Sequence, residues 1–188
     1  LVQVNSPCVT QASRRIEGAA AGRFFDSVTM RMRDTVLFVP CVTEHKIVEW
    51  VERNSGGVFV GRHSPNEPIV RAARDAAQRT KTPWKWYTPE GNELTDTFYM
   101  YGLLLEGLED VAPSGFALVP FWSTKIQGYK KTMYQMQTRR GTAPLYSNRL
   151  LFTSGDGVNK KGQAYKTLEV SFAVDGDPSR SAIPPTLD

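Results

Sequence analysis

Basic and aromatic side chains gather in one stretch of this chain that contains no acidic residue. No Asp or Glu occurs from Val111 through Gly155, although the chain holds 19 acidic residues. The formal net charge of the whole protein is +4, so the basic character is local and the rest of the chain is slightly acidic. Basic side chains interleaved with Trp and Tyr are suited to phosphate contacts and base stacking, which predicts a nucleic-acid partner. The basic residues of this stretch are Lys125, Lys130, Lys131, Arg139, Arg140 and Arg149.

The segment Lys125–Thr138 is predicted to be a helix that follows two candidate N-cap residues, Ser123 and Thr124. A helical wheel places Tyr134 between two lysines on the outer side, where it forms either a stacking and phosphate-binding unit or a plain solvated face. Arg139 and Arg140 follow at the helix end, where they can contact phosphate or simply favour the helix dipole. The inner arc, which we expect to face the core, consists of Ile126, Tyr129, Met133 and Met136.

Aromatic residues in strand-like segments extend the predicted interface. Tyr99 and Tyr101 share one face of the expected strand Thr95–Leu105, which makes either a stacking platform or ordinary sheet packing. Trp84 and Trp86 would point the same way in an extended segment, under a cover supplied by the protein or by a ligand. The candidate phosphate contacts are Arg62, Lys125, Lys130, Lys131, Arg139 and Arg140, and the candidate stacking residues are Trp86, Tyr99, Tyr101, Trp122 and Tyr134.

Residues for catalysis or metal binding are sparse. Cys8, Cys41, His45 and His63 match no zinc, triad or nuclease spacing, and the glycines near residues 56–61 lack the Lys and the following helix of a phosphate loop. We therefore expect a protein without catalytic activity, metal or cofactor. No apolar run approaches 18 residues and no signal-peptide pattern opens the chain, so a cytoplasmic protein is expected.

Alternating and apolar segments dominate the secondary-structure pattern. Thr35–Val39 is apolar on both faces, is disturbed by Pro40, and resumes at Ile47–Val51 as one long bent strand or two collinear strands. A short helix is predicted from Pro68 behind Asn66 as cap. Its apolar stripe is expected to be Ile69, Ala72, Ala73, Ala76 and Ala77. Further strands are expected at Val28–Arg33, Val58–His63, Trp84–Tyr87, Thr95–Leu105, Phe116–Trp122, Leu145–Phe152 and Ala164–Val174.

These elements predict a mainly β fold of the β-rich α+β class. The order strand, helix, strand, strand in the later part is compatible with an OB-like Greek-key barrel, with a helix between later strands and one extra short helix. A helix-covered antiparallel sheet of another topology would give a similar pattern. Residues 1–174 are expected to form a single domain with an N-terminal arm, and residues 175–188 an extended tail.

Three segments resemble a family of small bacteriophage-encoded proteins that bind single-stranded DNA. They are Val36–Cys41 leading to Ile47–Trp50, the glycine-rich strand Gly56–His63, and the Val-Pro-Phe strand that enters a basic helix, Leu118–Lys131. The resemblance covers about two thirds of the chain and implies an OB-like accessory protein of phage DNA replication or recombination. The chain departs from the family in its C-terminal tail, where only Asp175, Asp177 and Asp188 are acidic. Recruitment of partners through an acidic tail is therefore not supported.

The first hypothesis is therefore sequence-tolerant binding of single-stranded DNA in the host cytoplasm, without catalysis. Binding of RNA and self-association remain open. An alternative is a structural or assembly protein of a phage that uses the aromatic strands as a protein interface. A third, weaker hypothesis is a nuclease.

Overall fold

A computed structural model provides the structure of the chain. It describes residues 9, 15–51, 57–107, 112–140, 143–159 and 161–173, without the side chains of Arg139 and Arg140. The predicted tail at 175–188 and most of the predicted N-terminal arm lie outside the described residues. The elements in chain order are β1 (Phe24–Asp26), β2 (Arg31–Arg33), β3 (Val36–Trp50), β4 (Phe59–His63), α2 (Pro68–Gln78), β5 (Trp86–Tyr87), β6 (Glu93–Leu105), β7 (Gly115–Trp122), α3 (Lys125–Arg140), the 3-10 helix η3 (Leu145–Ser147), β8 (Leu150–Val158) and β9 (Ala164–Phe172).

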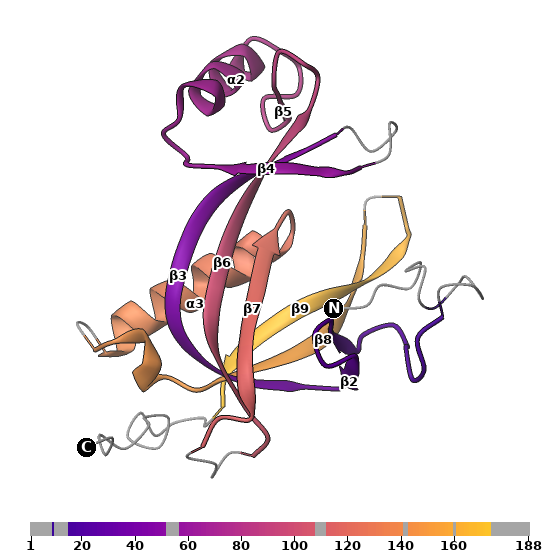
Figure 1. The fold of residues 1–188 in the computed structure, drawn as a ribbon, viewed down its shortest axis with the longest axis vertical. Helices are drawn as coiled ribbons and strands as arrows, with labels where there is room; N and C mark the ends of the chain where they lie inside the picture. The colour runs from indigo at the N-terminus through magenta and orange to yellow at the C-terminus, as the bar shows by residue number, and fades with distance from the viewer. Residues whose placement is uncertain are drawn as a thin grey trace. The chain divides into compact units, whose positions relative to one another are not determined.

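The fold is mainly β and belongs to the β-rich α+β class, as predicted. Seven strands form a sheet with the path β5-β6-β3-β8-β9, to which β4 is added at β3 and β7 at β6, and Figure 1 shows β3, β6 and β7 side by side. As expected, α3 lies between later strands of the sequence and α2 is a second, shorter helix. The closure of an OB-like barrel stays a prediction.

The long strand β3 matches the first of the two predicted alternatives, one long strand in place of two collinear strands. It runs for 15 residues and continues through Pro40, which has no backbone N–H to donate to a neighbouring strand. Its first residues pair with β8, as in Val36 opposite Phe152, and its last residues pair with β4, as in Val48 opposite Arg62. Both pairings are antiparallel. One strand thus contributes to two different parts of the sheet.

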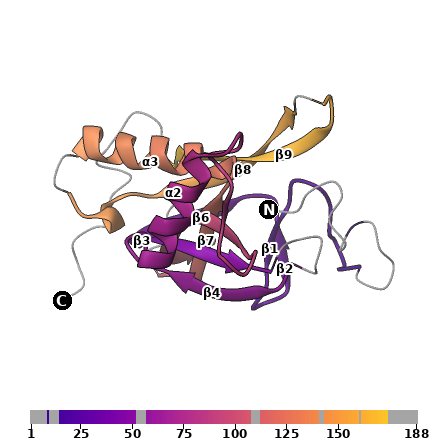
Figure 2. The same ribbon diagram turned by 90° about the horizontal axis from the view of Figure 1, so that it is seen from above.

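Two compact units can be distinguished in the chain. Unit 2 consists of Thr43–Met100 and Leu118–Ile126, and unit 1 of the segments before, between and after them. The expectation of one domain over residues 1–174 stays a prediction. In unit 2, helix α2 packs on the sheet through Val70 and Ala73, which contact Ile47 of β3 and Leu94 of β6. Figure 2 shows the helix beside these strands.

Helix α2 begins at Pro68, as predicted, but two details of its prediction are wrong. The cap residue is Glu67, not Asn66, because Glu67 has the extended backbone that precedes the helix. Ala73 and Ala77 of the predicted stripe are buried, as expected, but Val70 is buried with them, whereas Ala72 and Ala76 are exposed. Val70 and Ala73 pack on Ile47 and Leu94, and this tertiary contact decides which side of the apolar stripe is most deeply buried.

The core of unit 1 forms where β3 and β6 approach each other closely. Leu37, Val39 and Leu105 make one buried cluster, and the ring of Phe38 lies 5.4 Å from that of Phe152. Gly102 is required at this point, since a Cβ there would collide with the carbonyl oxygen of Val39 and the ring of Phe38.

Two segments that were expected to be strands are turns. Residues 27–30 form the turn between β1 and β2, where Asp26 accepts hydrogen bonds from the backbone N–H of Val28 (2.9 Å) and from the hydroxyl of Thr29 (2.6 Å). This side-chain capping outcompetes the alternation of Val28 and Met30. At Leu145–Ser147 a 3-10 turn replaces the start of the predicted strand, because Pro144 precedes it and its carbonyl accepts hydrogen bonds from both the backbone N–H and the hydroxyl of Ser147.

Candidate nucleic-acid interface

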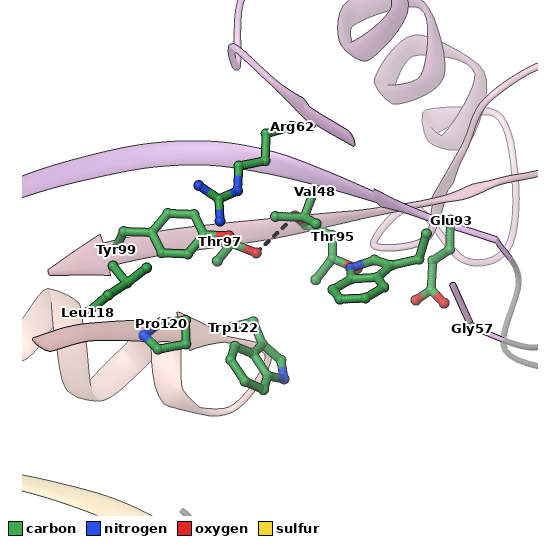
Figure 3. A pocket seen from close by; sticks show the side chains of 11 residues that line it. Val48, Gly57, Arg62, Glu93, Thr95, Thr97, Tyr99, Leu118, Pro120 and Trp122 are labelled. Carbon is green, nitrogen blue, oxygen red and sulfur yellow. Dashed lines mark hydrogen bonds between the residues drawn. The ribbon is translucent and has the colours of Figure 1, made fainter. Parts of the chain in front are cut away.

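A groove of about 450 Å³ lies on one face of the sheet in unit 2 (Figure 3). Side chains alternate between the two faces of a strand, so residues two apart on β3, β6 and β7 all reach this face. Arg62 comes from β4, the neighbour of β3. The lining residues are Val48, Trp50, Gly57, Arg62, Glu93, Thr95, Thr97, Tyr99, Leu118, Pro120 and Trp122.

A cation covers the aromatic ring at the inner end of the groove. The guanidinium carbon of Arg62 lies 4.8 Å from the centre of the Tyr99 ring. Figure 3 shows the two side chains facing each other. Tyr99 is only 6 % exposed, whereas Arg62 is exposed. The ring therefore positions the guanidinium group, which can meet a phosphate, and leaves little aromatic surface for a base.

A second cation lies over the more accessible ring of Trp122. The Nζ atom of Lys125 is 4.2 Å from the centre of that ring, and the indole is 38 % exposed. Burial lowers the pKa of Lys125. Lys125 is also the first residue of α3, whose first turn carries no acidic side chain. The partial positive charge of a helix N-terminus and the Lys125 ammonium therefore act together on any nearby anion.

The floor and the far end of the groove add polar groups to this aromatic and cationic surface. Thr95 and Thr97 lie in the middle of the floor, and the Thr97 hydroxyl donates a hydrogen bond to the carbonyl of Thr95 (3.2 Å, Figure 3). Glu93 places a carboxylate at one end, and it is the acidic residue among the lining side chains. Trp50 packs its ring edge-on against Phe59 at 5.7 Å. The groove thus combines flat apolar surface, hydroxyl groups, the guanidinium group of Arg62 and the carboxylate of Glu93, and Lys125 lies over its Trp122 ring.

A family model described as "Pam3 phage gp34-like protein" matches residues 1–181 of the chain. The chain belongs to this phage protein family. The match supports the expectation of a phage protein. No curated protein and no solved structure matches the chain.

Three of the side chains predicted for the interface of this gp34-like protein line the groove in unit 2, namely Arg62, Tyr99 and Trp122. A fourth, Lys125, lies over the ring of Trp122. Tyr101, the proposed partner of Tyr99 in a stacking platform, belongs to unit 1 and is half-buried.

Trp86 and Trp84 do not form the expected pair of indoles. Trp86 packs against the core cluster under α2, its ring is covered by the guanidinium group of Arg74 at 4.5 Å, and its Nε1 donates to the carbonyl of Pro83 (3.1 Å). The protein itself therefore covers Trp86. Trp84 lies in a turn and is 71 % exposed, so the expectation of an extended segment there is wrong.

The helix α3 has the predicted start and the predicted phase in this family member, and it extends to Arg140. Tyr129 is 8 % exposed and Tyr134 is 67 % exposed, which confirms the assignment of one tyrosine to the core and the other to the surface. Lys130 and Lys131 are exposed. Arg149, which contributes to the basic stretch of the sequence, is buried, so the charge of this stretch is only partly at the surface.

The sequence interpretation missed Trp50, Thr95, Thr97, Leu118 and Pro120 as groove residues. A signal for them was present in the spacing of two residues along each of the three strands. Glu93, Thr95 and Thr97 are the clearest part of this signal, because polar side chains at alternate positions of β6 indicate one face that is not a purely apolar core.

The polar network on the other face of β3 has a structural explanation. Both ring nitrogens of His63 form hydrogen bonds, one with Glu49 at 2.7 Å and the other with Glu67 at 2.9 Å. The side-chain amide of Asn92 donates a further hydrogen bond to Glu49 at 2.7 Å. The hydrogen bond to Glu49, with that to Glu67, raises the pKa of His63. Burial alone would raise the pKa of Glu49, but its bonds to Asn92 and His63 outweigh burial and lower it.

Within the residues described, no group of three or more His, Cys, Asp or Glu side chains is arranged to hold a metal ion. Nor does this part of the chain include a helix that is long and apolar enough to cross a membrane.

Proposed function

We propose that this phage protein binds single-stranded DNA without strong sequence preference, as an accessory protein of phage replication or recombination in the host cytoplasm. The observation that carries the proposal is that each of two aromatic rings lining one groove lies under a cation, Tyr99 under Arg62 and Trp122 under Lys125. Proteins that bind single strands combine cationic grooves with aromatic side chains on which bases stack.

The groove supports tolerance of sequence more than base readout. The Trp122 indole presents a flat face to any base, since every base has a π-face. Arg62 and Lys125 supply charge for the phosphates, which are the same at every nucleotide. The proposal includes no catalytic step, and it assigns His63 to the structural network with Glu49 and Glu67.

A second candidate, a structural or assembly protein, is favoured by one observation. The segment entering β4 exposes three successive apolar side chains, Val58, Phe59 and Val60. Such a run is typical of a surface that another protein covers. In this case the protein would bind no oligonucleotide, and substitution of Phe59 would reduce assembly of phage particles.

Fluorescence polarisation with labelled oligo-dT at two salt concentrations tests the first proposal. If about 4–6 basic residues of the protein contact phosphate, log K should fall with log salt at a slope of about −3 to −4, near −0.7 per contact. No binding at low salt, or binding that does not respond to salt, would contradict the proposal. Cleavage of the same oligonucleotide after addition of Mg²⁺ would indicate a nuclease.

Two tryptophan variants locate the binding surface. Trp122→Ala should weaken oligo-dT binding by about 1–3 kcal/mol, because one stacking surface is lost. Trp84→Ala is the matched control, since Trp84 is the more exposed indole and lies outside the groove. Its affinity should equal that of the unmodified protein. Equal losses in the two variants would place binding elsewhere.

A further inference from the structure

An exposed tyrosine continues the groove of unit 2 beyond its lining residues. Tyr87 of β5 is directly opposite Glu93 of β6, and Glu93 lines the groove. Residues directly opposite each other in an antiparallel pair point to the same face of a sheet. The neighbouring pair agrees with this assignment, because Trp86 and Leu94 are opposite each other and both pack in the core under α2. The side chain of Tyr87 is therefore on the groove face.

Tyr87 and Trp122 stand along the same edge of β6. In the sheet, β6 has β3 on one side and β5 on the other, and β7 also pairs with β6. Figure 1 shows β6 between β3 and β7, so β5 and β7 follow one another along the edge that faces away from β3. The strand β7 ends at Trp122, whose ring lines the groove, and β5 ends at Tyr87. The two rings therefore belong to one aromatic edge of the groove face.

The backbone on both sides of Tyr87 is fixed. Before it, Trp86 packs against the core and its Nε1 donates to the carbonyl of Pro83. After it, Thr88 is 4 % exposed and its backbone N–H donates to the carbonyl of Asn92 at 2.9 Å. The ring of Tyr87 is nevertheless 38 % exposed. An aromatic side chain on a fixed backbone offers a large contact area and loses little conformational entropy when it binds a ligand.

A carboxylate beside Tyr87 determines which part of a nucleotide can approach the ring. The Cβ atoms of directly opposite residues are about 4.5–5.5 Å apart, so the Glu93 side chain starts beside that of Tyr87. A negative charge repels a phosphate, which Arg62 and Lys125 attract at the rings that they cover. At Tyr87 the base, not the phosphate, is therefore the part of a nucleotide that faces the sheet.

We propose that Tyr87 is a further base-stacking residue, over which a bound single strand leaves the groove. This inference rests on the proposed function and adds the path of the strand, which follows the outer edge of β6 from Trp122 to Tyr87. The site then takes at least one nucleotide more than the groove alone. Stacking on Tyr87 is as tolerant of sequence as stacking on Trp122, because every base has a π-face.

Titration of the full chain with labelled oligo-dT, followed by fluorescence polarisation, tests the role of Tyr87. Tyr87→Ala should weaken binding by about fivefold or more, through loss of one stacking surface. Tyr87→Phe keeps the ring and should bind within about twofold of the unmodified protein. Trp84→Ala is the matched control, because Trp84 lies three residues earlier and is more exposed, and its affinity should not change. Unchanged binding by Tyr87→Ala would overturn the proposal, as would equal losses in Tyr87→Ala and Tyr87→Phe.

The salt dependence separates a lost base contact from a lost phosphate contact. Tyr87→Ala should keep the salt slope of the unmodified protein, because stacking releases no counterions. A slope reduced by about 0.7 or more would mean that the substitution disturbs a phosphate contact, and the stacking role would be overturned.

Failure of this inference can be distinguished from failure of the proposed function. If oligo-dT binds and Trp122→Ala weakens binding while Tyr87→Ala does not, the groove proposal stands and the path over Tyr87 is wrong. If oligo-dT does not bind at low salt, the proposed function is wrong and the inference falls with it.

Discussion

Neighbouring residues of β3 in unit 2 serve two different surfaces. Ile47 lies in the core cluster under α2, whereas Val48 lines the groove. The same division runs along β6, where Leu94 joins the core and Thr95 faces the groove. On the covered face, buried polar groups find partners within the protein, as Glu49 does in His63 and Asn92. On the open face, cations lie over rings beside a groove.

This difference shows how one strand separates stability from binding. Because side chains alternate, substitution at one position should change the free energy of unfolding, and substitution at the next should change affinity. Any variant on this strand that changes the free energy of unfolding and the affinity together would contradict this separation.

The largest expected effect is on the covered face. Ile47→Ala should lower the free energy of unfolding by about 2–5 kcal/mol, because it leaves a cavity in the core under α2. The protein that remains folded should bind oligo-dT normally. Urea denaturation and oligonucleotide titration measure the two quantities. Val60→Ala, at an exposed position of β4, is the control and should cost less than about 0.5 kcal/mol. A similar cost for both variants would mean that α2 does not cover Ile47.

An intermediate effect is expected from pH, through His63. Its pKa in the folded protein is raised above the usual 6.5, so its contribution is fully present below pH 6.5 and is lost as the pH rises through the raised value. The expected loss is about 1.5–3 kcal/mol, the range for hydrogen bonds to charged groups. Urea denaturation at several pH values measures it.

The variant His63→Gln isolates this titration. Its deficit in stability relative to the unmodified protein should be largest at and just below pH 6.5 and should shrink toward alkaline pH. A constant deficit across pH would contradict the assignment.

The loss of stability at acid pH does not report on a single group. The pKa of Glu49 is lowered below its usual 4.5, and that of Glu106 in unit 1 is lowered to about 2 by its hydrogen bonds to Arg33 and Ser114. Those contributions are present above the usual carboxyl pKa and are lost as pH falls through the lowered values.

The smallest expected effect is on the open face. Arg62→Ala should weaken oligo-dT binding by about two- to fivefold and reduce the salt slope by about 0.7, the value for one phosphate contact. Arg71→Ala, at an exposed position of α2 outside the groove, should leave both unchanged. Identical salt slopes for Arg62→Ala and the unmodified protein would mean that Arg62 does not contact phosphate.

Much of the fold could be predicted because local signals agreed with the tertiary structure. Pro68 marked the start of α2, and the apolar arc of α3 predicted that Tyr129 is buried and Tyr134 exposed. The turn at residues 27–30 could not be recognised from hydrophobic alternation, because hydrogen bonds to Asp26 determine it. The phase of α2 depended on contact with Ile47, which is distant in sequence.

The candidate site was predictable in composition but not in arrangement. The sequence indicated that Arg62, Tyr99, Trp122 and Lys125 could bind nucleic acid, and each residue type was chosen for its chemistry. Their association requires the pairing of β4 with β3 and of β7 with β6, which links segments far apart in the chain. Trp86 shows the converse, because its indole had the right chemistry and the fold placed it against the core.

The division of the chain into interleaved segments has a consequence for folding during synthesis. Every segment of unit 2 has been made once Ile126 has left the ribosome, whereas unit 1 still lacks β8 and β9 at that point. At roughly 5–20 residues per second, the ribosome needs several seconds more to reach Phe172. During that interval Leu37 and Val39 have no β8 to pack against. The groove can therefore be assembled while about half of the nascent protein still exposes apolar strands. A chaperone or a premature ligand would influence folding most strongly during this interval.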